Sequence, residues 1–377
     1  MGPSALSLEV RASSPAQVAR RSTELIERVP HPCGGLVFVT GELGDELPTL
    51  ARLIADLQTG IPWLLAAGPG LLTTSGEVVG QSAATLLVWA NGSPFTASLS
   101  PDDPSDLGSC LERELGPDLD CPCLLIMQDS GLTAGGLSLA LSRFRSRCLF
   151  GAITSGRSLP HVVDHGHVDS GTGALMCFRG LSTPTLATSP ASRLLTAPAR
   201  VTRVKGPLLL EIDARPAIDF LQRAGARLTS PELILLAVVP DLRAVGRRGQ
   251  PPMVLRMLRG VDPSRQALVL DQPIDVGSHV AIAVRDAGAA HANLEETLGD
   301  LKQRLAGAAP LFVLHFDAMA RGRSLYGTGD VDSRMLRQRL GELPVAGLKS
   351  SLEIAPLTDT PMALTLTALF AVFTNPS

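Results

Sequence analysis

The feature of this sequence that most restricts its fold is a threefold repetition of one order of elements: helix, strand, helix, strand, strand. In each copy two segments have the apolar periodicity of an amphipathic helix, and three shorter segments are apolar enough for buried strands. The helix-like segments are 15–29 and 45–58, then 105–116 and 133–145, then 291–307 and 330–343. The strand-like segments are 34–40, 61–67 and 84–90, then 122–128, 148–153 and 173–178, then 310–316, 344–348 and 362–373.

This order of elements predicts an α+β fold. Helices that precede and follow strands must bury their apolar stripes on a sheet, so we expect mixed sheets with helices on the outside. Nearly every strand-like segment is apolar throughout, which is typical of strands covered on both faces. We therefore expect a helix–sheet–sheet–helix layered sandwich of mixed sheets built from repeated α-β-α-β-β units, with a pair of separate α/β sheets as the alternative.

A strand-rich stretch, residues 181–286, separates the second copy from the third, and within it 241–252 has the composition of a loop. The chain is long enough for two domains. We expect residues 1–180 to form one domain with two repeated units. Residues 181–377 form the other, with the strand-rich link at 181–286 and the third unit at 287–377.

Composition argues against several classes of partner. The net charge is -3 and the 33 basic residues are scattered, so we expect no nucleic-acid surface. The six cysteines include no CxxC pair and most lie in apolar segments, which indicates reduced thiols in a cytoplasmic protein. Residues 1–17 lack the pattern of a signal peptide, and the apolar segment 362–373 is too short to cross a bilayer. We expect no membrane insertion, and we interpret 362–373 as one long core strand.

Several short segments along the chain carry a family resemblance. They are "FDAMARGRSLYG" (316–327), "LPVAGL" (343–348) and "SSLEIAP" (350–356), together with the hairpin-like stretch 188–221 and the stretch 253–287 that leads into the third unit. In this order they resemble the FIST proteins, a sensory domain in two parts, FIST N and FIST C. The resemblance implies a protein that binds a small ligand and passes a signal to a separate partner, such as a histidine kinase.

Three positions depart from the family pattern. Ala318 replaces a loop cysteine, Ser192 replaces a cysteine that precedes Arg193, and Leu352 replaces a glycine that precedes Glu353. A leucine removes room beside the backbone and removes easy access to positive φ. The fold is therefore expected to carry over from the family more fully than the ligand.

The loop after the segment 310–316 is the strongest candidate for a ligand site. Arg321, Gly322 and Arg323 follow a buried strand directly, a place where sheets present loops to ligands, and guanidinium groups suit bidentate carboxylate binding. The alternatives are a solvated loop or a salt bridge to a neighbouring acid. Glu353 is a candidate partner for a ligand ammonium, which together with Arg321 would suit an amino acid. Glu353 is equally compatible with a helix cap or an ion pair with an arginine.

Three equivalent loops rich in glycine, serine and threonine follow corresponding strands, at 66–77, 152–160 and 346–353. Such loops can converge on one pocket lined by backbone N–H groups, or they can be plain connections. From the second loop we select Ser155 and Gly156 as candidate ligand-binding residues, and from the resemblance we add Arg193.

Histidines are densest in "HVVDHGHVD", which contains His161, His165 and His167. Alternation in an extended segment would place His165 and His167 on one side, as metal ligation requires, but a turn-rich hairpin with solvent-facing histidines explains the pattern equally. Some proteins that resemble this family bind haem and sense nitric oxide, which would need an axial imidazole from this group or from His31 or His315. Otherwise we expect no cofactor.

Motifs typical of enzymes are missing from the sequence. It has no G-x-S-x-G, P-loop or H-E-x-x-H motif. We therefore expect a non-enzymatic, cytoplasmic sensory protein that binds a small anionic or zwitterionic ligand. The alternatives are a haem-based nitric oxide sensor and a protein-interaction scaffold without a ligand.

Overall fold

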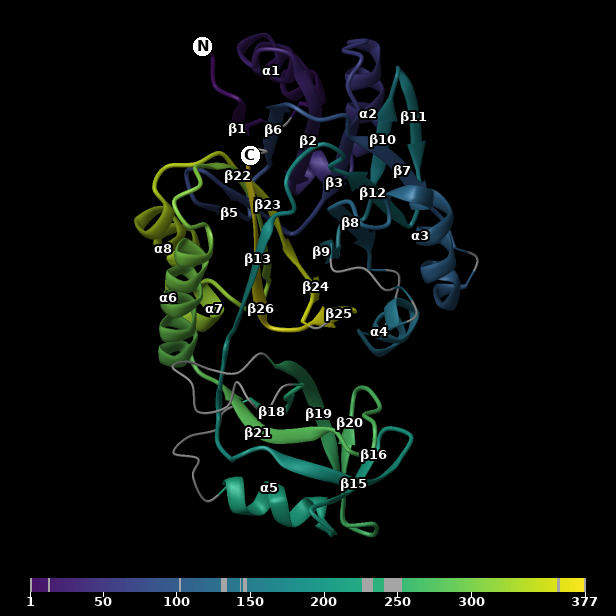
Figure 1. The fold of residues 1–377 in the computed structure, drawn as a ribbon, viewed down its shortest axis with the longest axis vertical. Coiled ribbons are helices and arrows are strands. Elements are labelled where there is room, and N and C mark those ends of the chain that lie inside the picture. The colour runs from purple at the N-terminus through teal and green to yellow at the C-terminus, as the bar shows by residue number, and fades with distance from the viewer. Residues whose placement is uncertain are drawn as a thin grey trace.

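Figure 1 shows a computed structural model of the chain, which describes residues 2–12, 14–101, 103–129, 134–142, 144, 148–225, 233–240, 253–357 and 360–375. The loop predicted at 241–252 lies outside these residues. Within them the sheets are mixed and helices cover their outer faces, which confirms the predicted α+β layered fold of repeated units. The described residues form three six-stranded sheets in the upper body of Figure 1 and an eight-stranded sheet in a lower lobe.

The first sheet has the strand order β1-β6-β2-β3-β10-β11. Its strands are β1 (Ala5–Arg11), β2 (Pro32–Thr40), β3 (Trp63–Ala67), β6 (Ala83–Ala90), β10 (His161–Asp164) and β11 (His167–Ser170), and its helices are α1 (Pro15–Arg28) and α2 (Leu47–Asp56). Along β2, Phe38 faces a core shared by all three sheets, whereas Val37 and Val39 pack under the helices. The strand is apolar throughout because both of its faces are covered.

The second sheet has the order β25-β24-β9-β8-β12-β7. Its strands are β7 (Phe95–Leu99), β8 (Cys123–Gln128), β9 (Leu149–Thr154), β12 (Gly173–Cys177), β24 (Leu352–Pro356) and β25 (Pro361–Leu364), and its helices are α3 (Leu107–Leu115) and α4 (Ala134–Ser142). Leu125 and Met127 pack beneath the two helices, while Leu124 and Ile126 enter the shared core.

The third sheet has the order β13-β26-β22-β23-β4-β5. Its strands are β4 (Gly70–Thr73), β5 (Glu77–Val79), β13 (Thr185–Pro190), β22 (Pro310–Ala318), β23 (Val345–Ser350) and β26 (Thr367–Thr374). Helices α6 (Ala287–Arg304) and α8 (Val331–Leu340) cover its outer face, and the short α7 (Arg323–Tyr326) lies in the loop between β22 and α8. Asp286 caps α6 by accepting a hydrogen bond from Ala289 N.

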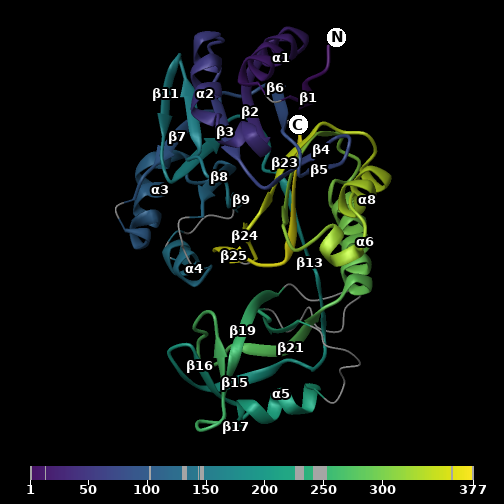
Figure 2. The same ribbon diagram turned by 180° about the vertical axis from the view of Figure 1, so that it is seen from behind.

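The three units have the same order of helices and strands, and each unit contributes a hairpin to the sheet of another unit. In each unit the second and third strands are a parallel pair joined by a helix: β2 with β3, β8 with β9, and β22 with β23. The hairpin that follows each pair then joins another unit's sheet. Hairpin β4–β5 pairs with β23, β10–β11 pairs with β3, and β24–β25 pairs with β9. Figure 2 shows β4 and β5 beside β23. The three units therefore form one body.

The inner faces of the three sheets enclose a single apolar core. Its centre is aromatic: Phe178 and Phe373 have ring centroids 4.6 Å apart, and Phe312 stacks on Phe373 at 4.6 Å. Trp89 of the first unit packs on Phe178 and Phe312 at 5.3 and 5.6 Å. All three units thus contribute to one packed centre.

The lower lobe follows β13 and ends where α6 begins (Figure 1). Its strands are β14 (Ser192–Leu194), β15 (Ala199–Lys205), β16 (Leu208–Ile212), β17 (Arg215–Pro216), β18 (Ile234–Val238), β19 (Val254–Asp262), β20 (Ala267–Leu270) and β21 (His279–Arg285). Helix α5 (Ala217–Gly225) packs on them through Phe220 and Ala224.

One predicted element is wrong in detail. The segment 362–373 contains two strands, β25 and β26, rather than one long strand. Leu366 lies between them with φ 53°, and this left-handed conformation turns the chain. Among the described residues, no helix is long and apolar enough to cross a membrane.

Candidate functional site

The third unit carries charges where the other two units are apolar. Each unit has one pair of parallel strands, and the residues that face each other can be counted along it. The fifth facing pair is Val39 with Ala67 in the first unit and Met127 with Ile153 in the second. In the third unit the corresponding pair is Asp317 and Lys349. The fold therefore accepts an apolar pair at this position, and the charges are particular to the third unit.

Asp317 and Lys349 form a buried ion pair, with Lys349 Nζ 2.7 Å from Asp317 Oδ2. Lys349 Nζ also lies 3.2 Å from Oε1 of Glu77, which belongs to the β5 strand of the first unit. The hairpin exchange thus brings a carboxylate of one unit to the lysine of another.

Arg321 follows β22 and is also buried, with 2% of the residue exposed. Its guanidinium binds Asp332 of α8 in a bidentate manner, with Nε 2.8 Å from Oδ2 and Nη2 3.1 Å from Oδ1. Nη1 donates to the Ser189 carbonyl at 2.9 Å, and Nη2 donates to the Tyr326 hydroxyl at 2.8 Å. Nε is 3.0 Å from Asp317 Oδ1, so Arg321 joins the ion pair to α8. Arg321 thus forms a salt bridge to neighbouring acids, which was one of the alternatives to a ligand site for this residue.

Glu353 extends the group of charges into the second sheet. It lies on β24 and is fully buried. Ser350 Oγ donates to Glu353 Oε1 at 2.6 Å, and the Thr367 backbone lies close enough to lower the pKa of this carboxyl group, but no donor among the described residues reaches Oε2 with hydrogen-bond geometry. An unpartnered carboxyl oxygen in the interior is costly for the fold, and it is free to accept a hydrogen bond from a ligand. We call Glu77, Asp317, Arg321, Asp332, Lys349 and Glu353 the charge cluster.

Burial and pairing shift the pKa values of these groups in different directions. Burial raises the pKa of Asp317 to about 7, against the opposing effects of Lys349 and Arg321. Burial also raises the pKa of Glu353 well above its usual value. For Asp332, burial acts in the same direction, but the Arg321 guanidinium outweighs it and holds the pKa below the usual value. Burial therefore favours the neutral form of Glu353, the Arg321 guanidinium favours the ionised form of Asp332, and Asp317 is close to its titration point at neutral pH.

The loop 319–330 covers the charge cluster. Gly322 has φ 76°, and a Cβ built on it would lie 2.9 Å from Glu77 Oε1 and 3.3 Å from Lys349 Nζ. Asp330 anchors the other end of the loop, because its Oδ1 accepts from Glu77 N and its own N donates to Glu77 Oε2 at 3.4 Å. Only a glycine at 322 allows both this backbone conformation and this close approach.

The structure brings together some of the residues predicted from sequence. Arg321, Gly322 and Glu353 meet at the charge cluster, while Arg323 begins α7 with an exposed side chain. Arg193 lies on β14, where its Nε is 3.2 Å from Asp286 Oδ2. Sequence reasoning did not select Asp317, Asp332, Lys349 or Glu77, although a charge inside an otherwise apolar strand marks both Asp317 and Lys349.

The three equivalent loops meet by direct backbone contact. A Cβ on Gly68 would lie 3.1 Å from Lys349 O, and one on Gly156 would lie 2.6 Å from Ala67 O. Ser351 N donates to Ile153 O at 2.8 Å. Each unit therefore touches the next at this point. Ser155, beside Gly156, is exposed.

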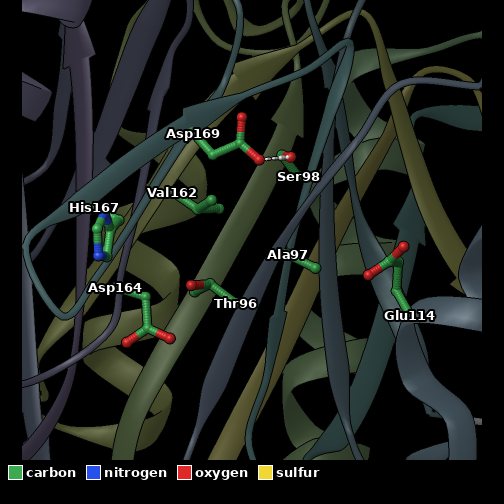
Figure 3. A pocket seen from close by; sticks show the side chains of 8 residues that line it. All are labelled: Thr96, Ala97, Ser98, Glu114, Val162, Asp164, His167 and Asp169. Carbon is green, nitrogen blue, oxygen red and sulfur yellow. Dashed lines mark hydrogen bonds between the residues drawn. The ribbon is translucent and has the colours of Figure 1, made fainter.

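The histidine-rich segment forms the hairpin β10–β11. His165 occupies its turn with φ 46°, and His161 is 7% exposed with Nδ1 2.8 Å from the Leu159 carbonyl oxygen. His167 lines a surface hollow of about 370 Å³ together with Asp164, Asp169 and other residues (Figure 3). This hollow is polar, so it does not fit the apolar face of a haem. No group of three or more potential metal ligands is found among the described residues.

His315 is a second buried histidine, and it lies on β22, the strand that also carries Asp317. It is fully buried on β22 and stacks on Phe370 with ring centroids 4.4 Å apart. Burial lowers its pKa to about 3, so the ring is neutral. Neither ring nitrogen has a hydrogen-bond partner among the described residues.

Comparison with known families assigns both halves of the chain. The FIST N domain model matches residues 35–215, and the FIST C domain model matches residues 217–356. The chain belongs to the FIST family. FIST domains are sensory domains of signal transduction. In this FIST protein the boundary between the two matches falls in the lower lobe, between β17 and α5.

Relatives of this FIST protein occur in mycobacteria. Uncharacterized proteins of Mycobacterium bovis and of Mycobacterium tuberculosis strain CDC 1551 are each 31% identical to it over 193 residues, which is 50% of either chain. The FIST chain thus matches about half the length of these relatives. Among solved structures, cyanuric acid hydrolase from A. caulinodans is similar over 98% of both chains, at 10% identity and a TM-score of 0.35.

Two positions where the FIST pattern is altered lie beside the charge cluster. Ala318 ends β22 and pairs with Ser350, and Leu352 begins β24 opposite Ile153. Leu352 is not among the residues with positive φ, so the side chain introduces no backbone strain there. A leucine at this position is compatible with the local conformation that the structure shows.

Proposed function

We propose that this FIST protein is a sensory protein that binds a small anionic or zwitterionic ligand at the charge cluster and signals through a separate partner, such as a histidine kinase. The observation that carries the proposal is the Asp317–Lys349 pair, which replaces the apolar pairs of the other two units. Burying an ion pair in place of apolar residues rarely stabilises a protein. A function other than folding accounts for its presence.

The chemistry of the charge cluster suits a ligand with both charges. Lys349 and Arg321 are the cations for a ligand carboxylate, which would compete with Glu77 for Lys349 Nζ, 3.2 Å away. A ligand ammonium beside the unpartnered Oε2 of Glu353 would favour the ionised carboxylate, which then accepts a hydrogen bond from it. An amino acid carries both groups, and a dicarboxylate carries only the first.

The loop 319–330 is the entrance in this proposal. It is held over the charge cluster by the Asp330–Glu77 hydrogen bonds at one end and the Arg321–Asp332 bridge at the other. A ligand carboxylate that displaces Glu77 from Lys349 also weakens the Asp330 anchor, because Asp330 binds the same glutamate. Ligand binding is thereby coupled to the position of α7, whose Arg323 and Ser324 are exposed and accessible to a signalling partner.

Thermal unfolding against a ligand panel tests the proposal. The panel contains the common amino acids, succinate, an alkylamine and inorganic phosphate. A ligand present at a hundred times its Kd stabilises the folded state by about 2.7 kcal/mol. We expect a shift with an amino acid or a carboxylate, its loss in Lys349→Met, and its retention in Arg265→Ala, a control in the lower lobe. If no panel member shifts the wild type, the scaffold alternative is favoured, and a Soret band after haem reconstitution would favour the haem sensor.

A further inference from the structure

Three of the six cysteines lie together at one end of β8 and β12, far in sequence from the charge cluster. Cys123 on β8 faces Cys177 on β12. Cys121 lies two residues before Cys123, with Pro122 between them. Cys123 Sγ donates to the Cys121 carbonyl oxygen at 3.3 Å, and both Cys121 and Cys123 lie close enough to Cys177 to lower its pKa. All six cysteines are in the described part of the chain, and none is in a disulfide.

The backbone register places Cys123 and Cys177 at the right separation for a disulfide. Phe178 N donates to Pro122 O at 2.8 Å, so residues 122 and 178 form a hydrogen-bonded pair. The next pair, Cys123 and Cys177, is then a non-hydrogen-bonded pair, in which Cα atoms are about 4.5 Å apart. Disulfides span Cα distances of about 4.4–6.8 Å. The two thiols can therefore be joined without moving the main chain.

Cys121 is the member of this group of three that is partly exposed to solvent. Cys123 and Cys177 are 1% and 0% exposed, whereas Cys121 is partly exposed. Cys121 Sγ lies 3.5 Å from Asp118 Oδ1, and Asp118 in turn binds Arg179 at the surface. Cys33 is also partly exposed, but its Sγ contacts the His31 carbonyl at 3.4 Å instead of a second thiol.

The three sulfurs affect one another's ionisation. The nearby Cys123 lowers the pKa of Cys177 against the opposing effect of burial, and Cys121 acts in the same direction as Cys123. Burial raises the pKa of Cys121 to about 12, and the interaction with Cys177 raises that of Cys123. The first thiolate of the group is therefore on Cys177. Thiolates are the reactive form of cysteine.

We propose that Cys121, Cys123 and Cys177 form an oxidation site that a hydroperoxide converts to a disulfide. The Cys121 sulfur, on losing its proton to solvent, attacks the peroxide; the O–O bond breaks, leaving Cys121 sulfenic acid and an alcohol or water. Cys177 then attacks the Cys121 sulfur and hydroxide leaves as water. Cys123 next attacks the Cys177 sulfur and releases Cys121 as a thiol. The net change consumes two thiols and one peroxide and yields one disulfide, one water and the reduced peroxide.

The Cys123–Cys177 disulfide would close a long loop that includes α4, β9, β10 and β11. A crosslink of this span raises the melting temperature of a chain of this size by about 5 °C, because it restricts the unfolded state. The strands it joins are already paired, so the folded second sheet keeps its geometry.

Oxidation of the reduced, full-length protein with hydrogen peroxide tests the site. We expect two thiols to be lost to maleimide labelling, the Cys177 peptide to be linked to the peptide that holds Cys121 and Cys123, and the melting temperature to rise by about 5 °C until dithiothreitol is added. Trypsin leaves Cys121 and Cys123 in one peptide, so variants must distinguish them. Failure to link Cys177 to either cysteine would overturn the proposal.

Three variants assign the roles. Cys177→Ala abolishes the disulfide, and Cys121→Ser slows its formation by about tenfold or more while the final Cys123–Cys177 product is unchanged. Cys33→Ser is the matched control and leaves rate and product as in the wild type. A wild-type rate in Cys121→Ser would overturn its role as the entry thiol. If Cys177→Ala melts lower in the reduced state, Cys123→Ala provides a second test. In Cys123→Ala we expect oxidation to stop at a Cys121–Cys177 disulfide. An unlinked Cys177 in that variant would contradict the proposed transfer of the disulfide from Cys121 to Cys123.

Discussion

Lys349 Nζ lies 2.7 Å from Asp317 Oδ2 across the parallel strands β22 and β23, and each side chain is 1% exposed. The same register position holds Val39 with Ala67 in the first unit. The third unit therefore has two buried charges at a position where the other two units have apolar side chains. Our account holds that this pair serves ligand recognition rather than stability.

The first prediction concerns the stability cost of breaking this pair. Lys349→Ala leaves Asp317 with Arg321 alone, and Asp317→Val leaves Lys349 with Glu77 alone. Either variant should therefore lower the free energy of unfolding, by up to about 3–5 kcal/mol. The double variant restores the pair found in the first unit and should regain most of that loss. Urea unfolding measures all three. A double variant less stable than either single variant would show that the charges are needed for folding.

The pH dependence of stability provides a second prediction. Burial raises the pKa of Glu353, so the folded state holds a proton that the unfolded state releases above its ordinary pKa of 4.5. Stability should therefore fall as pH rises above this ordinary pKa, by up to about 1.4 kcal/mol per pH unit for one proton. Asp317, with its pKa raised to about 7, acts in the same direction.

Glu353→Gln isolates the contribution of Glu353. The glutamine cannot ionise, so its urea unfolding curve should depend less steeply on pH than that of the wild type. Glu295→Gln, an exposed position on α6, is the control and should keep the wild-type slope. Equal slopes in Glu353→Gln and the wild type would mean that Glu353 is ionised in the folded protein.

A third prediction concerns Arg321 and the loop that it anchors. Arg321→Met leaves Asp332 buried without its bidentate partner and should lower the free energy of unfolding by about 3–5 kcal/mol. It should also speed hydrogen exchange at amides of the loop 319–330. Arg323→Met, two residues away and exposed, should change stability by less than about 0.5 kcal/mol. Similar effects of the two variants would contradict the anchoring role.

The lower lobe supplies a fourth prediction. Arg256 is 6% exposed, and its Nε and Nη1 have no hydrogen-bond partner among the described residues. Burial lowers its pKa, with Asp271 partly opposing this. Arg256→Met keeps the length of the side chain and removes the unpaired donors, so it should stabilise the protein by about 1–3 kcal/mol in urea unfolding. Arg259→Met, exposed on the same strand, should be neutral. A destabilised Arg256→Met would indicate a partner that binds this guanidinium.

The repeated helix and strand order could be predicted from the sequence, because each unit has long segments of clear periodicity. The hairpin exchange could not. Strands β4 and β5 are short and lie in a stretch, 66–77, that is rich in glycine, serine and threonine, so Gly70–Thr73 looks like a turn until its partner is known. That partner is β23, more than two hundred residues away, and local periodicity carries no information on it.

The candidate site was predictable only in part. Arg321 and Glu353 stand out as charges near a strand end. Asp317 and Lys349 lie inside strands of the structure, but in the sequence they directly follow the predicted strands 310–316 and 344–348, where a solvent-facing charge is ordinary. Their burial follows from the loop 319–330 and from Glu77, which arrives by the hairpin exchange. Asp332 lies in a helix whose sequence shows only ordinary solvent-facing charges.

Ligand binding by the Asp317→Val/Lys349→Ala double variant tests the central claim most directly. The probe is the amino acid, succinate or phosphate that raises the melting temperature of the wild type, applied at the same concentration to both proteins. Our account predicts a double variant that unfolds cooperatively near the wild-type midpoint and shows no ligand-induced shift. A shift equal to that of the wild type would place the ligand elsewhere and contradict the account.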